Sequence, residues 1–471
     1  PPPPSSGGGS SGGEESVERG PLETDLELNQ RLIDAASTDT SQPGFQLFMS
    51  PHVNPILALG SYVYVTNTPN GTIDVLDADT RVVVQQIDVG LEPMSLAARP
   101  DSSELWVSNH VSDSVNVIDT APDSPLLHTV VSVIDHLDLP AGETVFDEPA
   151  GIAFASNEKA YVALSQTNHV AVIDATTYEV TKLLHVPAQD PRAIAVVGDK
   201  LLVLPFESNN QTQLSGGTAD GIDGDVCTFD AIEHVFTNNN VLSLNYVADI
   251  VKNPELPDRD LLVYDTSSEQ LIETVEGLGT LLYGITVTEN GQVVIAQTDA
   301  RNDANGLAGS AGHGLAELEN RPFLNQLSVV LCGTNDPCDT QASRIRLESP
   351  PPDQLGDGSA LATPYSVVAI PDTSWIAGTA AGSDEVFIVD VNHQTLLTRH
   401  SVGATPRGIT SLTLAGKPSL WTYNAVDNSI SRLSIEEDAS LTRVQTIALQ
   451  DPRPETLKQG WHLFESARTS T

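Results

Sequence analysis

The sequence predicts an all-β fold, a seven-bladed β-propeller, from three observations. One unit of strand-length apolar runs recurs every roughly 40 to 50 residues, the spacing of propeller blades. Each run is rich in β-branched residues and is bounded by turn residues. Seven copies of the unit fit between about Gly44 and Gln450. The predicted regions are a low-complexity tether and lead-in over residues 1–43, the propeller over 44–450, and a tail over 451–471.

Each unit is predicted to hold four strands, called a to d in chain order. A small residue and Pro precede strand a, strand b ends in Asn or another polar residue, strand c ends in Ile-Asp, and strand d ends near Val-Gly. The first three units match this pattern best, and the fourth and fifth match it least because each carries a large insertion after strand b. The units begin near Asn54, Glu92, Glu148, Asp190, Tyr283, Thr363 and Thr405.

The first unit also resembles a known family. Its segment Tyr64-Val-Thr-Asn67, followed by Ile73-Asp-Val-Leu-Asp77, resembles the YVTN β-propeller repeats of bacterial and archaeal surface or periplasmic proteins. The resemblance implies an exported protein that is periplasmic, anchored to the outer membrane or extracellular. Residues 1–13 are a Pro, Ser and Gly spacer of the type that follows the lipidated cysteine of bacterial lipoproteins, so a lipid anchor is expected; a cloning linker or disordered end is the alternative.

The tail carries a second resemblance. The segment from Gly460 to Ser470 resembles the stretch that precedes the haem-attaching Cys-x-x-Cys-His of dihaem cytochrome c peroxidase-like proteins. No such motif occurs here, so we expect no covalent haem within this chain. The resemblance implies a c-type haem domain as a neighbour, with a role in electron transfer. The alternative is a tail that packs on the propeller.

The charge narrows the choice of partners. The chain has 22 Lys and Arg against 63 Asp and Glu, a formal net charge of −41. Such a surface repels phosphate backbones and anionic lipids, which argues against nucleic acid. It suits a cation or a basic protein partner, although a solvated surface adapted to salt explains it equally well. No apolar run approaches the roughly 20 residues of a transmembrane helix.

A binding site is expected on one face of the propeller. In a four-stranded antiparallel blade the start of strand a and the end of strand b lie at the same end, so polar residues there converge around the axis. Both insertions, residues 207–259 and 298–325, are b–c loops on this face. For any one of these residues, the alternative is that it satisfies turn backbone groups. The predicted ligand-binding residues are Asn67, Asn109, Arg192, Glu207, Asp299, Arg301, Arg407 and Asn424.

Two groups of residues have the chemistry of metal ligands. Asp220, Asp223 and Asp225 are closely spaced carboxylates with intervening glycines, which suits calcium. His52 and His110 fall on the same face in adjacent units and, with Glu207, suit a transition metal; hydrogen-bonded histidines are the alternative.

The cysteines predict a disulfide. Cys332 and Cys338 bracket a short turn that a disulfide would close in an oxidising compartment, which would leave Cys227 unpaired.

Two functions follow from these observations. The first is a binding scaffold at the cell envelope that offers one face to a metal, a small ligand or a protein partner. The alternative is a propeller metalloenzyme of the redox or lyase type. No Gly-x-Ser-x-Gly, phosphate loop or His-Glu-x-x-His motif occurs, so the sequence does not decide whether the protein is an enzyme.

Overall fold

The computed structural model describes residues 49–135, 146–208, 210–216, 227–228, 248–305, 318, 321–333, 336–339, 341–351, 353 and 359–467. The chain divides into two units, Pro1–Phe45 and Gln46–Thr471, and every described residue belongs to the second.

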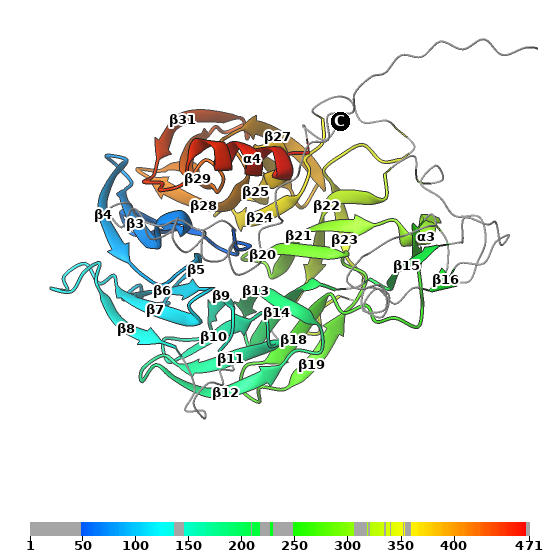
Figure 1. The fold of residues 1–471 in the computed structure, drawn as a ribbon, viewed down its shortest axis with the longest axis horizontal. Coiled ribbons are helices and arrows are strands. Elements are labelled where there is room, and N and C mark those ends of the chain that lie inside the picture. Colours follow the sequence, from blue (N-terminus) through cyan, green and yellow to red (C-terminus); the bar gives the residue numbers. More distant parts are fainter. Residues whose placement is uncertain are drawn as a thin grey trace, which may run out of the picture. The chain divides into compact units, whose positions relative to one another are not determined.

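Five separate antiparallel sheets each contain four strands that follow one another in the chain (Figure 1). Sheet 1 contains β1 (Ile56–Leu59), β2 (Tyr62–Asn67), β3 (Thr72–Asp77) and β4 (Val82–Asp88). Sheet 2 contains β5 (Pro93–Ala98), β6 (Glu104–Asn109), β7 (Ser114–Asp119) and β8 (Val130–Ile134). Sheet 3 contains β9 (Pro149–Phe154), β10 (Lys159–Leu164), β11 (His169–Asp174) and β12 (Glu179–His185). Sheet 6 contains β24 (Pro364–Ala369), β25 (Trp375–Ala380), β26 (Glu385–Asp390) and β27 (Thr395–Ser401). Sheet 7 contains β28 (Pro406–Leu414), β29 (Lys417–Asn424), β30 (Ser429–Ile435) and β31 (Leu441–Ala448).

Sheets 4 and 5 are two groups of four strands that one residue pair, Glu207 with Leu281, joins into an eight-stranded sheet. Sheet 4 contains β13 (Gln189–Val197), β14 (Lys200–Glu207), β18 (Leu261–Asp265) and β19 (Leu271–Val275). Sheet 5 contains β20 (Leu281–Val287), β21 (Gln292–Ala300), β22 (Phe323–Leu331) and β23 (Ser343–Arg346).

The expected insertions follow the second strand of sheets 4 and 5. A three-stranded sheet lies in the first insertion, and the short helix α3 lies in the second. The elements are β15 (Thr212–Gly216), β16 (Cys227–Thr228), β17 (Ala248–Lys252) and α3 (Asn302–Asn305).

The first strand of each sheet contacts the first strand of the next, and β28 of sheet 7 contacts β1 of sheet 1, so the sheets form a closed ring (Figure 1). The outermost strands are the most exposed: β4 is largely solvent-facing, whereas β3 is buried along most of its length. The predicted all-β fold is confirmed, and its arrangement is that of a β-propeller.

The core lies between neighbouring sheets. Tyr64 and Ile73 of sheet 1 pack against Leu96 of sheet 2, and Ile56 of sheet 1 packs against Trp421 of sheet 7. Full burial of one large apolar side chain stabilises the fold by about 1.5–3 kcal/mol. Because both faces of every sheet are covered, the Val, Ile and Leu runs of the repeat serve the core.

A recurring residue near the start of strand a links sheet 2 to 3, sheet 3 to 4 and sheet 6 to 7. Glu148, Asp190 and Thr405 directly precede a Pro at or near the start of strand a and have positive φ angles of 49°, 56° and 55°. Their backbone N–H groups donate to turn residues of the preceding sheet, namely to Asp113 Oδ1 at 3.0 Å, Asn168 Oδ1 at 2.9 Å and Asp384 Oδ1 at 2.8 Å. These acidic and amide turn residues therefore satisfy backbone donors.

Candidate functional site

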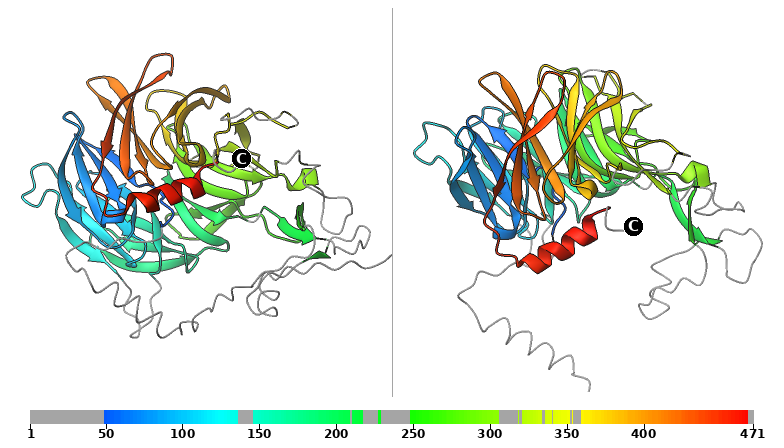
Figure 2. Two further views of the ribbon diagram at one scale, coloured as in Figure 1. Left: turned by 45° about the horizontal axis from the view of Figure 1, so that its top comes forward. Right: turned by 90° about the horizontal axis from the view of Figure 1, so that it is seen from above.

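The face where strands a begin and strands b end is called the b–c face below. The helix α4 (Glu455–Glu465) lies across it (Figure 2). The helix starts after Pro454, and Ser466 follows it with its backbone N–H donating to the His462 carbonyl oxygen at 3.0 Å. Among the described residues of α4 none is fully buried, so the helix lies on the sheets rather than within the core.

Five side chains from four sheets contact one another in a continuous row on this face. They are called the arginine–aromatic arc: Arg192, Phe206, Tyr283, Tyr365 and Arg407. The Arg192 guanidinium carbon lies 4.0 Å from the Phe206 ring centre, and the Arg407 guanidinium carbon lies 5.3 Å from that of Tyr365. Between them, the Phe206 and Tyr283 ring centres and the Tyr283 and Tyr365 ring centres are each 5.3 Å apart. Aromatic pairs and cation–π pairs at these distances are attractive.

Local sequence explains how the arc forms. Arg192, Tyr365 and Arg407 each directly follow a Pro at or near the start of a strand a, so they occupy equivalent positions on the innermost strands. The strands approach closely because Gly284 follows Tyr283: a Cβ atom at Gly284 would lie 2.4 Å from the Tyr365 carbonyl oxygen. Only a glycine fits this contact without a shift of the backbone.

One half of the arc is covered and the other is open. Arg407 and Tyr365 are 8% and 7% exposed, whereas Arg192, Phe206 and Tyr283 are half-buried. The cover is α4 and the residues after it. Glu465 accepts a hydrogen bond from Arg407 at 3.0 Å, His462 Nε2 lies 2.8 Å from Asp384 Oδ2, and the Ala467 N–H donates to the Gly382 carbonyl oxygen at 2.8 Å.

Both arginines of the arc have a carboxylate partner. Arg192 Nε donates to Asp190 Oδ1 at 2.8 Å, and a second guanidinium nitrogen contacts the other oxygen of this carboxylate. Arg407 pairs with Glu465 and also donates to the Ser50 carbonyl oxygen at 3.4 Å. No group within the described part of the chain accepts a hydrogen bond from Arg407 Nε, although this atom is buried.

The two predicted metal-binding histidines are buried beside the arc. His52 Nε2 lies 2.8 Å from Thr68 Oγ1, and because that hydroxyl donates to the Pro93 carbonyl oxygen, His52 is the donor. Burial holds the His52 pKa well below its usual value, and the positive charges of Arg407 and Arg453 lower it further. Burial also lowers the His110 pKa, and the Glu148 carboxylate opposes that shift from 3.7 Å.

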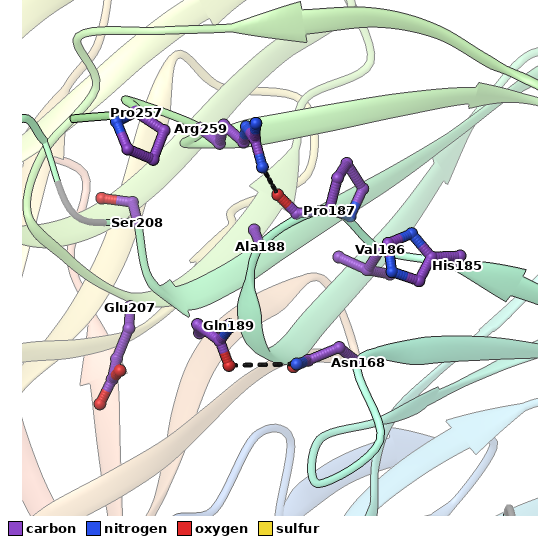
Figure 3. Close-up of a pocket in the computed structure, with 10 residues that line it drawn as sticks. All are labelled: Asn168, His185, Val186, Pro187, Ala188, Gln189, Glu207, Ser208, Pro257 and Arg259. Atoms are coloured by element: carbon purple, nitrogen blue, oxygen red, sulfur yellow. Dashed lines mark hydrogen bonds between the residues drawn. The ribbon is translucent and has the colours of Figure 1, made fainter. Parts of the chain in front are cut away.

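The third predicted ligand, Glu207, is exposed and lines a cavity of about 610 Å³ together with Asn168, Gln189 and Arg259 (Figure 3). In this cavity Asn168 donates to Gln189 Oε1 at 3.0 Å, and Arg259 donates to the Pro187 carbonyl oxygen. Within the described ranges, no three His, Cys, Asp or Glu side chains gather in a way that could hold a metal ion. Asp220, Asp223 and Asp225 lie outside the described residues.

Three of the predicted ligand-binding residues are fully buried structural groups, and we reassign them. Asn67 donates to Asp74 Oδ2 at 3.1 Å, Asn109 to Asn116 Oδ1 at 2.6 Å, and Asn424 to Ser431 Oγ at 3.0 Å. Each bond joins the end of strand b to strand c of the same sheet. The partners are side chains of strand c, so these asparagines link two strands of one sheet rather than satisfy the turn backbone groups named in the alternative.

Asn67 has a further structural role at the place where the ring closes. Its side-chain N–H donates to the Gln450 carbonyl oxygen at 2.9 Å, and its own oxygen accepts from Asn428 at 2.9 Å. Asn428 also donates to the Gln450 carbonyl oxygen at 2.9 Å. These three residues, called the closure clasp below, connect sheets 1 and 7.

The other two predicted ligand-binding residues lie at the end of β21. Asp299 accepts hydrogen bonds from Asn210 at 3.0 Å and Gln326 at 2.9 Å, and burial raises its pKa. Arg301 donates to the Leu318 carbonyl oxygen at 2.7 Å. Both line a second cavity of about 320 Å³, so the predicted set is spread over separate places on the face.

Sequence reasoning missed Phe206, Tyr283, Tyr365 and Glu465. A detectable signal existed for Tyr365, because it directly follows the Pro of its strand a, as Arg192 and Arg407 do. Cys332 and Cys338 form a disulfide in the structure. Among the described residues, no helix is long and apolar enough to cross a membrane.

Comparisons with known proteins give a fold and no family. No family model matches the chain, and no curated protein matches it. A chain of Kuenenia stuttgartiensis hydrazine synthase is similar in structure, with a TM-score of 0.56, 17% identity, and coverage of 84% of this chain and 98% of that one. Structures of U3-55K and of the RRP9 WD40 repeats each match with a TM-score of 0.46 and 9% identity. Both matches cover 75% of this chain; they cover 81% of the U3-55K chain and 80% of the RRP9 chain. At such identities the likeness to the hydrazine synthase chain shows a shared β-propeller-like fold alone.

Proposed function

We propose that this protein is a seven-bladed β-propeller of the YVTN-repeat type that acts as a binding scaffold, and that its ligand is a small organic molecule held by the open half of the arginine–aromatic arc. The observation that carries the proposal is the contiguous row of Arg192, Phe206 and Tyr283, which stays partly exposed although large aromatic groups usually bury themselves. A rigid ring of sheets presents this surface, and binding sites on such scaffolds need little rearrangement.

The cell envelope is the proposed location, with a lipid anchor as the proposed attachment and a c-type haem domain or other protein as the proposed neighbour. The Cys332–Cys338 disulfide supports export, because disulfides persist in oxidising compartments. Calcium at Asp220, Asp223 and Asp225 stays a proposal that metal analysis of the purified protein tests. The metalloenzyme alternative has less support, because Glu207 does not lie with His52 and His110 in any three-ligand group of the described residues.

The test of ligand binding uses three compounds with the same ring and different charge: benzoate, benzyl alcohol and benzylamine. Binding of each at millimolar concentration is followed by saturation-transfer NMR and calorimetry. We expect at least one to bind, and Tyr283→Leu to weaken its binding roughly fivefold, because leucine keeps the apolar volume but removes the aromatic face. The control is Tyr178→Leu, since Tyr178 is not part of the arc: its ring packs on Trp106 and its hydroxyl donates to Glu104, both on β6 of sheet 2. If no compound binds, or if both variants bind equally well, the proposed site is wrong.

A further inference from the structure

The covered half of the arc contains a buried cation whose partner comes from far along the chain. Arg407 is 8% exposed, and its carboxylate partner Glu465 lies 58 residues further on. A buried guanidinium is costly unless a hydrogen-bonded anion compensates it. The site therefore requires a carboxylate or an equivalent anion, whichever molecule supplies it.

The anion that fills the site is held by an element with little core of its own. The helix α4 has 11 residues, a length at which an isolated helix is unstable in water. Two polar contacts join it to the sheets, Glu465 with Arg407 and His462 with Asp384, and none of its residues is fully buried. Trp461 stacks 5.2 Å from the guanidinium carbon of Arg453, which precedes the helix. Phe464 is 87% exposed. Elements with few buried apolar contacts open at low free-energy cost.

The surroundings of Arg407 match a carboxylate attached to a flat apolar group. The Tyr365 ring lies against the guanidinium, and Tyr283 continues the aromatic surface toward the open half. Arg407 Nε is buried and has no acceptor among the described residues, so the guanidinium keeps hydrogen-bonding capacity that the single contact with Glu465 does not use. A bidentate carboxylate would use it.

The geometry points to a carboxylate-binding site at Arg407 and Tyr365 that Glu465 occupies in cis, so that α4 acts as a tethered competitor of an aromatic or other planar carboxylate. This inference rests on the proposed function, because it names the ligand class and the regulation of the same arc. An incoming carboxylate replaces Glu465 on Arg407, and α4 leaves the b–c face. The apparent affinity for the carboxylate is the intrinsic affinity multiplied by the fraction of molecules in which α4 has left the site.

The test uses the full chain with Glu465→Gln, which keeps the size of the side chain and removes its charge. The matched control is Glu455→Gln on the same helix, because Glu455 has a 68% exposed side chain and pairs only with Lys458 within the described residues. We expect Glu465→Gln to lower the dissociation constant of benzoate about tenfold, with Glu455→Gln equal to wild type. Benzylamine affinity should be the same in all three proteins. In Glu465→Gln combined with Arg407→Gln, the gain for benzoate should be lost.

A second measurement follows α4 directly. Benzoate should accelerate amide hydrogen exchange in residues 455–465 of the wild type and leave exchange in β24 unchanged. Equal benzoate affinity in Glu465→Gln and Glu455→Gln, or α4 exchange that does not respond to benzoate, overturns the inference. If benzyl alcohol or benzylamine binds at Tyr283 and benzoate does not bind to any variant, the inference fails while the proposed function stands. If none of the three compounds binds, both fail.

Discussion

The two halves of the arginine–aromatic arc use the same chemistry and differ in how their ion pairs are built. In the open half, Asp190 pairs with Arg192 from two residues away on the same strand, so β13 alone sets the geometry. In the covered half, Glu465 pairs with Arg407 only when α4 docks across sheets 6 and 7. The difference teaches that β13 alone builds the local pair, whereas the remote pair also requires α4 to be docked on the sheets.

The largest loss of stability is expected from a substitution that forces apart the strands carrying Tyr283 and Tyr365, where the two halves of the arc meet. Gly284 lies on β20 of sheet 5, where the Tyr365 backbone of sheet 6 leaves no space for a Cβ atom. Gly284→Ala should push β24 away and reduce the free energy of unfolding by about 3 kcal/mol, as overpacking against backbone does. Urea unfolding followed by tryptophan fluorescence measures it. A change below about 0.5 kcal/mol, the range of ordinary surface substitutions, would show that the strands can separate without cost.

A smaller effect on stability depends on pH and distinguishes His52, near Arg407, from His110, near Arg192. The folded-state pKa of His52 lies well below its unfolded value of about 6.5, so below pH 6.5 the unfolded chain binds a proton that the folded chain does not. Neutral His52 therefore makes its full contribution to the free energy of unfolding above pH 6.5. That free energy falls as the pH drops from 6.5 toward the folded-state pKa of His52, by at most about 1.4 kcal/mol per pH unit.

Replacement by glutamine should remove this slope, more in His52→Gln than in His110→Gln, because Glu148 offsets part of the burial effect at His110. The measurement is the free energy of unfolding at pH 5.5, 6.0 and 7.0 for both variants and the wild type. The many carboxylates contribute equally to all three proteins, so differences in slope report the histidines. Three parallel pH profiles would contradict the assigned burial.

The smallest effect concerns α4 alone. A Cβ atom at Gly460 would meet nothing within 4 Å, so Gly460→Ala changes only the helix propensity. Alanine favours a helix over glycine by about 1 kcal/mol, which should slow hydrogen exchange in α4 about fivefold and weaken benzoate binding by a similar factor. No change in exchange would mean that α4 stays helical when it leaves the surface, and faster exchange would contradict the assumption that only helix propensity changes.

The regular sheets were predictable because their sequence repeats. The segment Tyr62 to Asn67 is β2, and both insertions follow strand b as predicted. Because each sheet is buried on both faces, every copy contains short apolar runs separated by turn residues. This pattern can be read from neighbouring residues in the sequence.

The site was only partly predictable because its contacts are long-range. Asn67 and Asn424 stand where ligand-binding residues were expected, but their partners are buried polar groups of the adjacent strand. Tyr283 is the third residue of β20, a strand that lacks the usual Pro, and Glu465 reaches the site from a helix after the last sheet. A single sequence shows none of these pairings, because each depends on which residues the ring brings together.

The closure clasp has a consequence for how the ring comes apart. No sheet among the described residues combines strands from both ends of the chain, so β1 and β28 meet as edges of complete sheets. Opening the ring there requires separation of a side-chain interface and of the hydrogen bonds among Asn67, Asn428 and Gln450, while every strand pair survives. Under mechanical load or heat the molecule should therefore open as a chain of intact sheets, and the first break lies where its sequence begins and ends the ring.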